Sequence, residues 1–477
     1  MLTAEESIKV KLSFKECVIG EPSFYRKVAM VVVPMIIQNT LSNVVGLLDN
    51  IMVGQVGTLA MSSVAIVNQL MFVQMLCIWG ALAGAGIYGT QFFGRRDYEG
   101  VRYTMRFKTI IALVITAIAL VVFITAGEPL IKLYIAADTT PDDAIQTLNH
   151  AKSYLHIMLI GLFPFGITQV YAGTLRESGK TTLPMIASMA AMAVNFVFNL
   201  LLIFGYLGFP KLGVVGAAIA TVISRFVEMG IVTITAHRKK SDYAFLEGLY
   251  RHFVIPLDLI RPIITKSLPL LANEFLWSLG QAVLMQCYSI RGIEVIAALN
   301  IANTIAQIFN EVFLSLGNST SIVVGQELGA EHFVNARRDA WRMATLSVFS
   351  CFVMGTLLFL VSPIVPRFYN TEPAIKELAT QFIRVVAVVM PLNAFANVAY
   401  FTLRSGGKTL VTFLFDSCYV WTVSVIVARI LAYHTKMPVV EVYFTVCSLE
   451  VIKSAIGFIL VKKGIWVKNI VKKVPAA

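Results

Sequence analysis

Charged residues are scarce in this chain. Aspartate, glutamate, lysine and arginine make up 14% of its 477 residues, against roughly 25% in an ordinary soluble domain. Hydrophobic residues make up 57%. Runs of about twenty apolar residues recur along the whole length, each long enough to cross a bilayer as a helix and too continuous for a barrel strand. The composition excludes a soluble globular domain and predicts an all-α polytopic membrane protein.

Cysteine and histidine are also rare, with six of each. The cysteines form no C-x-x-C pair and lie mostly in apolar segments, where they serve as small hydrophobic residues. The histidines are scattered without an H-E-x-x-H pattern, and no G-x-S-x-G elbow is present. The sequence therefore predicts no enzyme, no disulfides and no cofactor.

One stretch resembles a nucleotide-binding loop. Residues 173–182 read G-T-L-R-E-S-G-K-T-T. A phosphate-binding loop needs a glycine at the start of a G-x-x-x-x-G-K pattern, after a short strand. Thr174 stands at that position, and the preceding apolar run is too long for a strand. The pattern returns as L-R-S-G-G-K-T at 403–409, so we interpret both copies as turns in which Gly179 and Gly407 supply the tight bend.

Twelve segments are long and apolar enough to span a membrane. The first 25 residues hold no apolar core, which predicts no cleavable signal. The long loop after the sixth segment is charged and aromatic, so we expect it to lie against lipid headgroups. The expected spans are 27–53, 58–92, 106–126, 152–174, 182–205, 213–236, 260–290, 295–328, 342–364, 376–402, 409–432 and 438–461. The expected domains are a cytoplasmic N-terminal segment (1–26), an N-lobe (27–236), a cytoplasmic inter-lobe loop (237–259), a C-lobe (260–461) and a cytoplasmic tail (462–477).

The two halves are copies of one another. An offset of 235 residues pairs identical residues in the two halves, and Pro164 faces Pro391 after small gaps. Because each copy has an even number of spans, the copies share one orientation, related by a pseudo-twofold axis along the membrane normal. Secondary transporters use this architecture, with the site near the middle of the membrane. The pairs at offset 235 are Pro34 with Pro269, Asn68 with Asn303, Gln91 with Gln326, and Gly94 with Gly329.

Basic residues give the chain a net charge of +12. They gather in alternate loops, on the side that holds both termini, while the opposite loops carry Glu128, Asp138, Asp142 and Asp143. The positive-inside rule then places both termini in the cytoplasm, in a multi-pass protein of the plasma membrane. The charge is an orientation signal and an attraction to anionic headgroups, so we expect no nucleic-acid partner. The basic loops include Arg95, Arg96, Arg176, Lys180, Arg238, Lys239, Lys240, Arg404 and Lys408.

Several short motifs occur along the chain: G-L-L-D-N-I-M-V-G at 46–54, the paired L-R-x-x-G-K-T turns, Asn195 with Asn199, and G-x-x-G-A-A-I-A-T-V-I-S-R at 213–225. Together they resemble the multidrug and toxic compound extrusion (MATE) family, in its bacterial, NorM-like form. The resemblance covers roughly residues 25–465. It implies a monomeric antiporter that expels cationic, amphipathic drugs or dyes across the bilayer. The exchange is for inward Na⁺ or H⁺, by alternating access between two lobes.

The N-lobe candidate site is centred on Asp49. A charged carboxylate in mid-membrane costs about 2.5–3.5 kcal/mol, so it must face the interior, pair, or be protonated. Asn195 and Asn199 lie on one helix face and offer carbonyl oxygens to a cation, which makes Na⁺ at Asp49, Asn195 and Asn199 possible. Asn68 is a further candidate. The alternatives are a solvated carboxylate near the helix end and asparagines that only join helices.

The C-lobe candidates are Glu274, Glu311, Asn303 and Asn393. The family resemblance marks Glu274 as an ion or substrate carboxylate, and its repeat partner is Asn39, so the halves differ there. Glu311 is a second carboxylate in apolar surroundings. The sodium-coupled NorM-like branch implies an aspartate in the tenth span, where this chain has Asn393. That difference removes one negative charge from the C-lobe.

Asp416 and Glu450 are two further acids within apolar spans. We interpret Asp416 and Glu450 as mainly structural, with Glu450 paired to Lys453 three residues on.

Two alternative functions fit the sequence less well. A lipid-linked oligosaccharide flippase of the same superfamily would need several cationic residues in its cavity, where Arg225 and Arg429 are the main ones. A major-facilitator carrier would need an acid where Phe92 and Phe93 stand.

Overall fold

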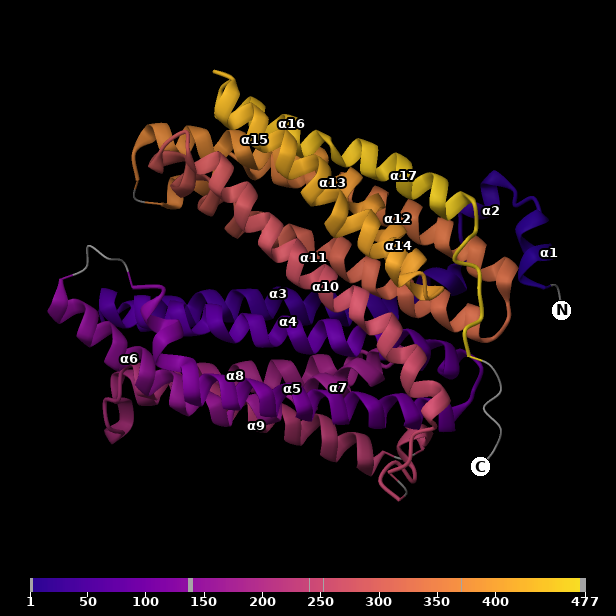
Figure 1. Ribbon diagram of the computed structural model, residues 1–477, viewed down its shortest axis with the longest axis horizontal. Coiled ribbons are helices and arrows are strands. Elements are labelled where there is room, and N and C mark those ends of the chain that lie inside the picture. Colours follow the sequence, from indigo (N-terminus) through magenta and orange to yellow (C-terminus); the bar gives the residue numbers. More distant parts are fainter. Residues whose placement is uncertain (1–2, 136–139, 240, 252, 370, 472–477) are drawn as a thin grey trace. The chain divides into compact units, whose positions relative to one another are not determined.

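The computed structural model describes residues 3–135, 140–239, 241–251, 253–369 and 371–471. Asp138, Lys240 and the end of the expected tail (472–477) lie outside the described residues. Across the described ranges the chain is almost entirely helical and contains no strand (Figure 1). The all-α fold class predicted from composition is confirmed.

Within the described residues, twelve helical segments match the twelve expected spans in order. Ten of them are long and apolar enough to cross a membrane, and the bent pair α6–α7 is an eleventh. The remaining one, α10, carries Asn273, Glu274 and Gln281 among its apolar residues. The segments are α3 (Pro22–Gly54), α4 (Thr58–Gly94), α5 (Tyr98–Lys132), α6 (Pro141–Ile160) with α7 (Leu162–Glu177), α8 (Thr182–Phe204), α9 (Val214–Arg238), α10 (Leu257–Ser289), α11 (Ile293–Gly329), α12 (Phe333–Val361), α13 (Pro373–Ser405), α14 (Thr409–Phe413) continued by η4 (Leu414–Cys418), η5 (Val420–Ser424) and α15 (Val425–His434), and α16 (Val439–Ser448) with α17 (Glu450–Lys462).

The chain divides into two compact units by its internal contacts. The N-unit comprises Ile37–Gly89 and Tyr98–Ile263, and the C-unit comprises Met1–Ile36, Thr90–Asp97 and Ile264–Ala477. Each has its own core: Val67, Ile131, Leu162 and Ile203 belong to the core of the N-unit, and Cys351, Phe382, Met390 and Ala428 to that of the C-unit. The start of α3 groups with the C-unit because Phe24, Val28 and Val32 pack against Leu316, Val323 and Met343.

One span of the N-unit is broken. Helices α6 and α7 meet at a bend of 46°. Gly161 lies at the bend, and Pro164 removes an amide that would continue the α6 ladder. The Gly161 carbonyl accepts from the Phe165 amide at 3.3 Å and from the Arg225 guanidinium of α9 at 3.2 Å, which anchors the bend to α9. The repeat partner Pro391 lies inside the unbroken helix α13, so the same proline has different effects in the two copies.

The two Gly-Lys-Thr stretches form the same turn. Gly179 has φ +79° and Gly407 has φ +72°, a region that favours glycine. In both turns the lysine amide donates to the leucine carbonyl five residues back, at 2.9 Å for Lys180 and 3.2 Å for Lys408. Helices α7 and α13, not strands, precede the turns. The predicted turns are confirmed, and the strand context of a nucleotide loop does not occur at either.

The ends of α4 and α11 also repeat one backbone. Arg96 and Glu331, which are related by the offset of the repeat, adopt left-handed φ of 62° and 61°. In each copy the next amide donates to the carbonyl five residues back at 2.9 Å. The duplication seen in the sequence is therefore present in backbone geometry, down to residues with unfavourable dihedral angles.

The two Q-x-x-G motifs cross each other within the C-unit. A Cβ placed on Gly94 would lie 2.6 Å from Gln326 Cα, and one placed on Gly329 would lie 2.6 Å from Gln91 Cα. Each glycine thus lies directly against the backbone of the partner motif. Because backbone cannot move aside as a side chain can, only glycine fits at either position.

Residues 463–471, which the sequence predicts only as part of a cytoplasmic tail, form a docked strap. Trp466 is buried, and its carbonyl lies against Gly406. The Gln91 side chain donates to the carbonyls of Ser405 (2.9 Å) and Lys468 (3.2 Å) and accepts from the Ile470 amide (2.8 Å). The strap therefore ties the end of α4 to the end of α13.

The N-terminal segment is docked on the C-unit as well. It contains two short helices, α1 (Ala4–Lys9) and α2 (Phe14–Val18), each begun by a capping box. Arg337 of α12 donates to the carbonyls of Ser7 and, at 3.0 Å, Val10. Arg342 donates to the Glu16 carbonyl at 2.8 Å. These arginine–carbonyl bonds fix the N-terminal segment against α12.

The loop between the halves packs on the N-unit. Arg106 of α5 donates to the carbonyls of Leu249 (2.8 Å), Val254 (3.0 Å) and Gly248 (3.2 Å). Tyr243 and Phe245 are buried, Phe245 in the short helix η2 (Ala244–Leu246). The expectation that this loop lies against headgroups is wrong for these two aromatic side chains, because protein covers them.

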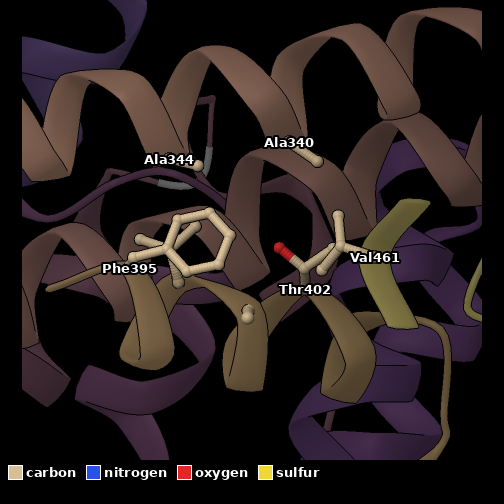
Figure 2. A pocket seen from close by; sticks show the side chains of 7 residues that line it. Ala340, Ala344, Phe395, Thr402 and Val461 are labelled. Atoms are coloured by element: carbon tan, nitrogen blue, oxygen red, sulfur yellow. The ribbon is translucent and has the colours of Figure 1, made fainter. Parts of the chain in front are cut away.

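Close packing in the C-unit leaves a small hollow between α12, α13 and α17 (Figure 2). Ala340 and Ala344 of α12 lie over Phe395 and Thr402 of α13, with Val461 at one side (Figure 2). The Thr402 hydroxyl has no hydrogen-bond partner among the described residues. The lining is otherwise apolar, so the hollow is a packing gap rather than a binding site.

We predict that Gly94→Ala and Gly329→Ala each destabilise the protein by about 1–3 kcal/mol, because the added methyl meets partner backbone. Gly173→Ala and Gly230→Ala are matched controls, since nothing lies within 4 Å of a Cβ at either site. The controls should be neutral or stabilising by about 0.5–1 kcal/mol. Thermal unfolding of the purified protein in detergent measures the difference. Equal unfolding temperatures for all four variants would contradict the crossing.

Candidate functional site

The N-unit holds the Asp49 carboxylate between helices α3 and α8. Asn195 and Asn199, one turn apart, present both amides from the same face of α8. Asn199 Nδ2 donates to Asp49 Oδ1 at 2.6 Å. Asp49 is partly buried, while the two asparagines are 5% and 1% exposed. The structure thus brings together the three residues predicted for an N-lobe cation site.

Asn195 also donates to Asp49 when its side-chain amide is turned so that both its oxygen and its nitrogen have hydrogen-bond partners. In that orientation its nitrogen lies 2.9 Å from Asp49 Oδ1 and 3.2 Å from Oδ2. Two amide nitrogens then donate to one carboxylate. Asn199 Oδ1 is buried and has no hydrogen-bond partner among the described residues. A carboxylate with a neighbouring unpaired amide oxygen is a donor set suited to a small hard cation.

Asn68 lies at the edge of the same region. It is exposed on α4, and it accepts a hydrogen bond from the Tyr154 hydroxyl of α6 at 3.4 Å. Tyr154 is within electrostatic reach of both Asp49 and Arg225. Asn68 is therefore linked to the Asp49 region through a tyrosine, which sequence spacing did not indicate.

A buried ion pair in the N-unit lies near the first Gly-Lys-Thr turn. Lys108 of α5, almost fully buried, pairs with Glu177 at the end of α7. The Glu177 carboxylate lies against α4, where Cβ atoms on Gly86 and Gly89 would come within 2.6 Å of its oxygens. Arg176 donates to Gln38 Oε1 at 3.0 Å. These contacts fix the helix ends, so Arg176, which the sequence predicts only as an orientation signal, also has a packing role.

Glu274 of α10 has a different environment in the C-unit. It is partly buried and has no hydrogen bond or ion pair to any of the described residues. Its electrostatic neighbours are Arg404 of α13 and Asp416 of η4. The neighbouring residue Asn273 is 3% exposed, and its Nδ2 donates to Asp416 Oδ2 at 3.0 Å. The sequence analysis does not name Asn273, whose signal is a polar Asn-Glu pair that interrupts an apolar run.

Lys453 of α17 links the two acids that the sequence analysis left as structural. Its Nζ lies 2.8 Å from Asp416 Oδ1 and 3.7 Å from Glu450 Oε1. The predicted pairing of Glu450 with Lys453 is confirmed. Asp416 is the closer partner, however, and it comes from a separate span that no local spacing connects to Lys453.

A π-helical stretch places Asp416 toward this network. Residues 414–418 and 420–424 form two π turns in a span that the sequence predicts as an ordinary helix. Ser417 follows Asp416, and both its amide (3.3 Å) and its hydroxyl (2.8 Å) donate to Asn273 Oδ1. Such π turns are frequent at functional sites because they rotate side chains out of the regular helical register.

The other C-lobe candidates are not joined to Glu274. Asn303 is exposed on α11 and Asn393 is partly buried on α13, and neither makes a side-chain hydrogen bond within the described ranges. Glu311 is partly buried on α11 and takes part in a hydrogen bond or an electrostatic interaction. No group of three or more His, Cys, Asp or Glu side chains able to hold a metal ion occurs in the described part of the chain.

Known proteins resemble this chain along most of its length. The MatE family model matches residues 34–201 and 269–433. A "Probable multidrug resistance protein NorM" of Thermotoga maritima is 24% identical over 454 residues, which cover 94% of this chain and 95% of that protein. A "Probable multidrug resistance protein YoeA" of Bacillus subtilis is 24% identical over 428 residues, covering 89% and 90%.

The fold has counterparts among solved structures. One is described as the outward-facing conformation of a multidrug resistance MATE family transporter of the MOP superfamily. It superposes with a TM-score of 0.80 at 19% identity and covers 95% of this chain and 98% of its own. The predicted fold of twelve helices is therefore confirmed as that of MATE transporters, which need no cofactor and are not enzymes. Because the MatE model matches well over half of the chain, this protein belongs to the MatE family and is a NorM-like, multi-pass membrane transporter.

Proposed function

We propose that the protein is a multidrug efflux antiporter that exports cationic, amphipathic compounds in exchange for inward Na⁺ or H⁺. The observation that carries the proposal is the Asp49 carboxylate, held inside the N-unit by the amides of Asn195 and Asn199. The names of the relatives from Thermotoga maritima and Bacillus subtilis support multidrug export. They give no support to the alternative of an oligosaccharide flippase.

In this proposal Asp49 exchanges one cation for another. A carboxylate within a span is costly while charged, and two amide donors offset only part of that cost. An entering Na⁺ or H⁺ neutralises it, and cationic cargo competes for the same charge. The N-lobe (27–236) and the C-lobe (260–461) then alternate the access of the site, with both termini in the cytoplasm. Glu274 is the proposed carboxylate of the C-lobe, and Glu311, Asn303, Asn393 and Asn68 are further proposed ligands.

The export of singly charged cargo needs more than the electrical work of one entering ion. One elementary charge that moves inward through 100 mV supplies about 2.3 kcal/mol, which is roughly fifty-fold in concentration. Cargo with one positive charge moves outward against the same potential and cancels that work. Export therefore needs a second ion or a chemical gradient, and carboxylates in both halves provide two places for ions.

We predict that Asp49→Asn abolishes ion-driven ethidium export in proteoliposomes, because the neutral amide cannot exchange one cation for another. Asp258→Asn is the matched control, since Asp258 is an exposed residue in the first turn of α10. The control should export at the rate of the wild type. Dissipating the Na⁺ and H⁺ gradients separately identifies the driving ion. Full export by Asp49→Asn would refute the proposal.

A second prediction concerns the amide donors. Asn199→Ala removes the 2.6 Å bond to Asp49, and a hydrogen bond to a charged group contributes about 1.5–3 kcal/mol. Because the bond favours the charged carboxylate, its loss should change the half-saturating concentration of the driving ion by about tenfold or more. Titration of initial export rates against that ion measures the change. An unchanged half-saturating concentration would separate Asn199 from the ion site.

A further inference from the structure

A lysine side chain is buried between two carboxylates in the C-unit. Lys453 is 8% exposed, and its Nζ lies 2.8 Å from Asp416 and 3.7 Å from Glu450. The Phe415 ring lies 5.7 Å from the same nitrogen. An unpaired lysine within a span is expensive, so this position requires the carboxylates around it.

Lys453 belongs to a network of charges that extends through Asp416 to Glu274 and Arg404, and these charges do not balance. Helix α10 contributes Glu274, η4 contributes Asp416, and α17 contributes Glu450 together with Lys453. Helix α13 contributes Arg404 and the Tyr400 hydroxyl, and the Tyr419 hydroxyl is occupied by the Leu449 carbonyl at 2.7 Å. Three carboxylates against two cations leave one negative charge without a partner. A buried cluster of this kind favours the uptake of one more positive charge.

The geometry locates the missing charge beside Glu274. Both oxygens of Asp416 are occupied, one by Lys453 and the other by the Asn273 amide at 3.0 Å. Glu274 is an electrostatic neighbour of Asp416, yet no donor contacts it among the described residues. A monovalent cation next to Glu274 would therefore complete the cluster and would also be attracted to Asp416.

The Lys453 side chain can move away from Asp416 and so make room for such a cation. Its ammonium group is on a flexible stem with rotatable donors, and Glu450 lies only slightly farther from it than Asp416 does. A move toward Glu450 would leave Asp416 available to an incoming cation. The reverse move would expel that cation, because two positive charges would otherwise share Asp416.

We propose that Lys453 is the internal counter-ion of a C-unit site in which Glu274 and Asp416 bind one exchangeable monovalent cation, and that Lys453 moves between Asp416 and Glu450 as this cation binds and leaves. The inference rests on the proposed antiport, and it names the residue that releases the cation. The cation is either the driving ion or the charged group of the cargo. Both have the same chemistry at this site, and separate titrations distinguish them.

The experiment uses the full-length protein in proteoliposomes. Export of ethidium is titrated once against the driving ion and once against ethidium itself. Lys453→Met leaves the cluster with one more uncompensated negative charge, so one of the two half-saturating concentrations should fall by about tenfold or more, with slower turnover because release is impaired. Lys453→Arg should remain close to the wild type in both titrations. Lys152→Met is the matched control, since Lys152 pairs with Glu128 at 2.6 Å in the N-unit; it should change neither value.

A double variant keeps the test decisive if Lys453→Met fails to fold. Asp416→Asn together with Lys453→Met has the same net charge as the wild type, and it should restore the half-saturating concentration within about threefold. Asp416→Asn alone should raise that concentration, since it removes one carboxylate. The inference is overturned if the wild type exports ethidium while neither half-saturating concentration changes in any Lys453 or Asp416 variant. A wild type without ion-driven export would instead overturn the proposed antiport.

Discussion

The cost of a charge inside a membrane-spanning helix governs both candidate sites. Each intramembrane carboxylate must find donors, a counter-charge or a proton, because lipid offers none. The N-unit meets this requirement with neutral donors: the amides of Asn195 and Asn199 surround Asp49. The C-unit uses a charge: Lys453 is placed against Asp416 and Glu450. An amide can solvate a carboxylate without neutralising it, whereas a lysine neutralises it and must move before another cation can enter.

The duplicated scaffold is preserved where backbone geometry is demanding. Gly179 and Gly407 form the same turn, and the ends of α4 and α11 share even the left-handed residues Arg96 and Glu331. The Q-x-x-G motifs meet without room for a methyl group. The polar residues have diverged: Asn39 is the repeat partner of Glu274, and the proline that accompanies a bend at Gly161 lies in an unbroken helix in the other copy. The two copies are thus more alike in backbone geometry than in their polar side chains.

Arginine and glutamine side chains of the helices hold the segments that lie outside the spans. Arg106 holds the loop between the halves, Arg337 and Arg342 hold the N-terminal segment, and Gln91 holds the strap at residues 463–471. All of them bind backbone carbonyls, and Arg342 also pairs with Asp339 at 3.1 Å. A guanidinium with several donors can satisfy free carbonyls of an irregular segment, which allows such segments to pack against helices without secondary structure of their own.

The amino-acid sequence by itself determined the helical class, the number and order of the spans, the duplication, the glycine turns and the resemblance to MATE transporters. The helical class, the spans and the turns follow from apolar run length and from local backbone requirements, which are properties of neighbouring residues. The duplication and the resemblance rest on short motifs compared along the chain. It also indicated Asp49 with Asn195 and Asn199, because helical spacing and the cost of a buried charge are local arguments. Only the tertiary structure decided that Asp416 faces Lys453 and Asn273, that Asn68 meets Tyr154, and that the strap docks on Gln91. Those contacts join spans far apart in the chain, one of them through π turns that shift the helical register, so no periodicity in the sequence encodes them.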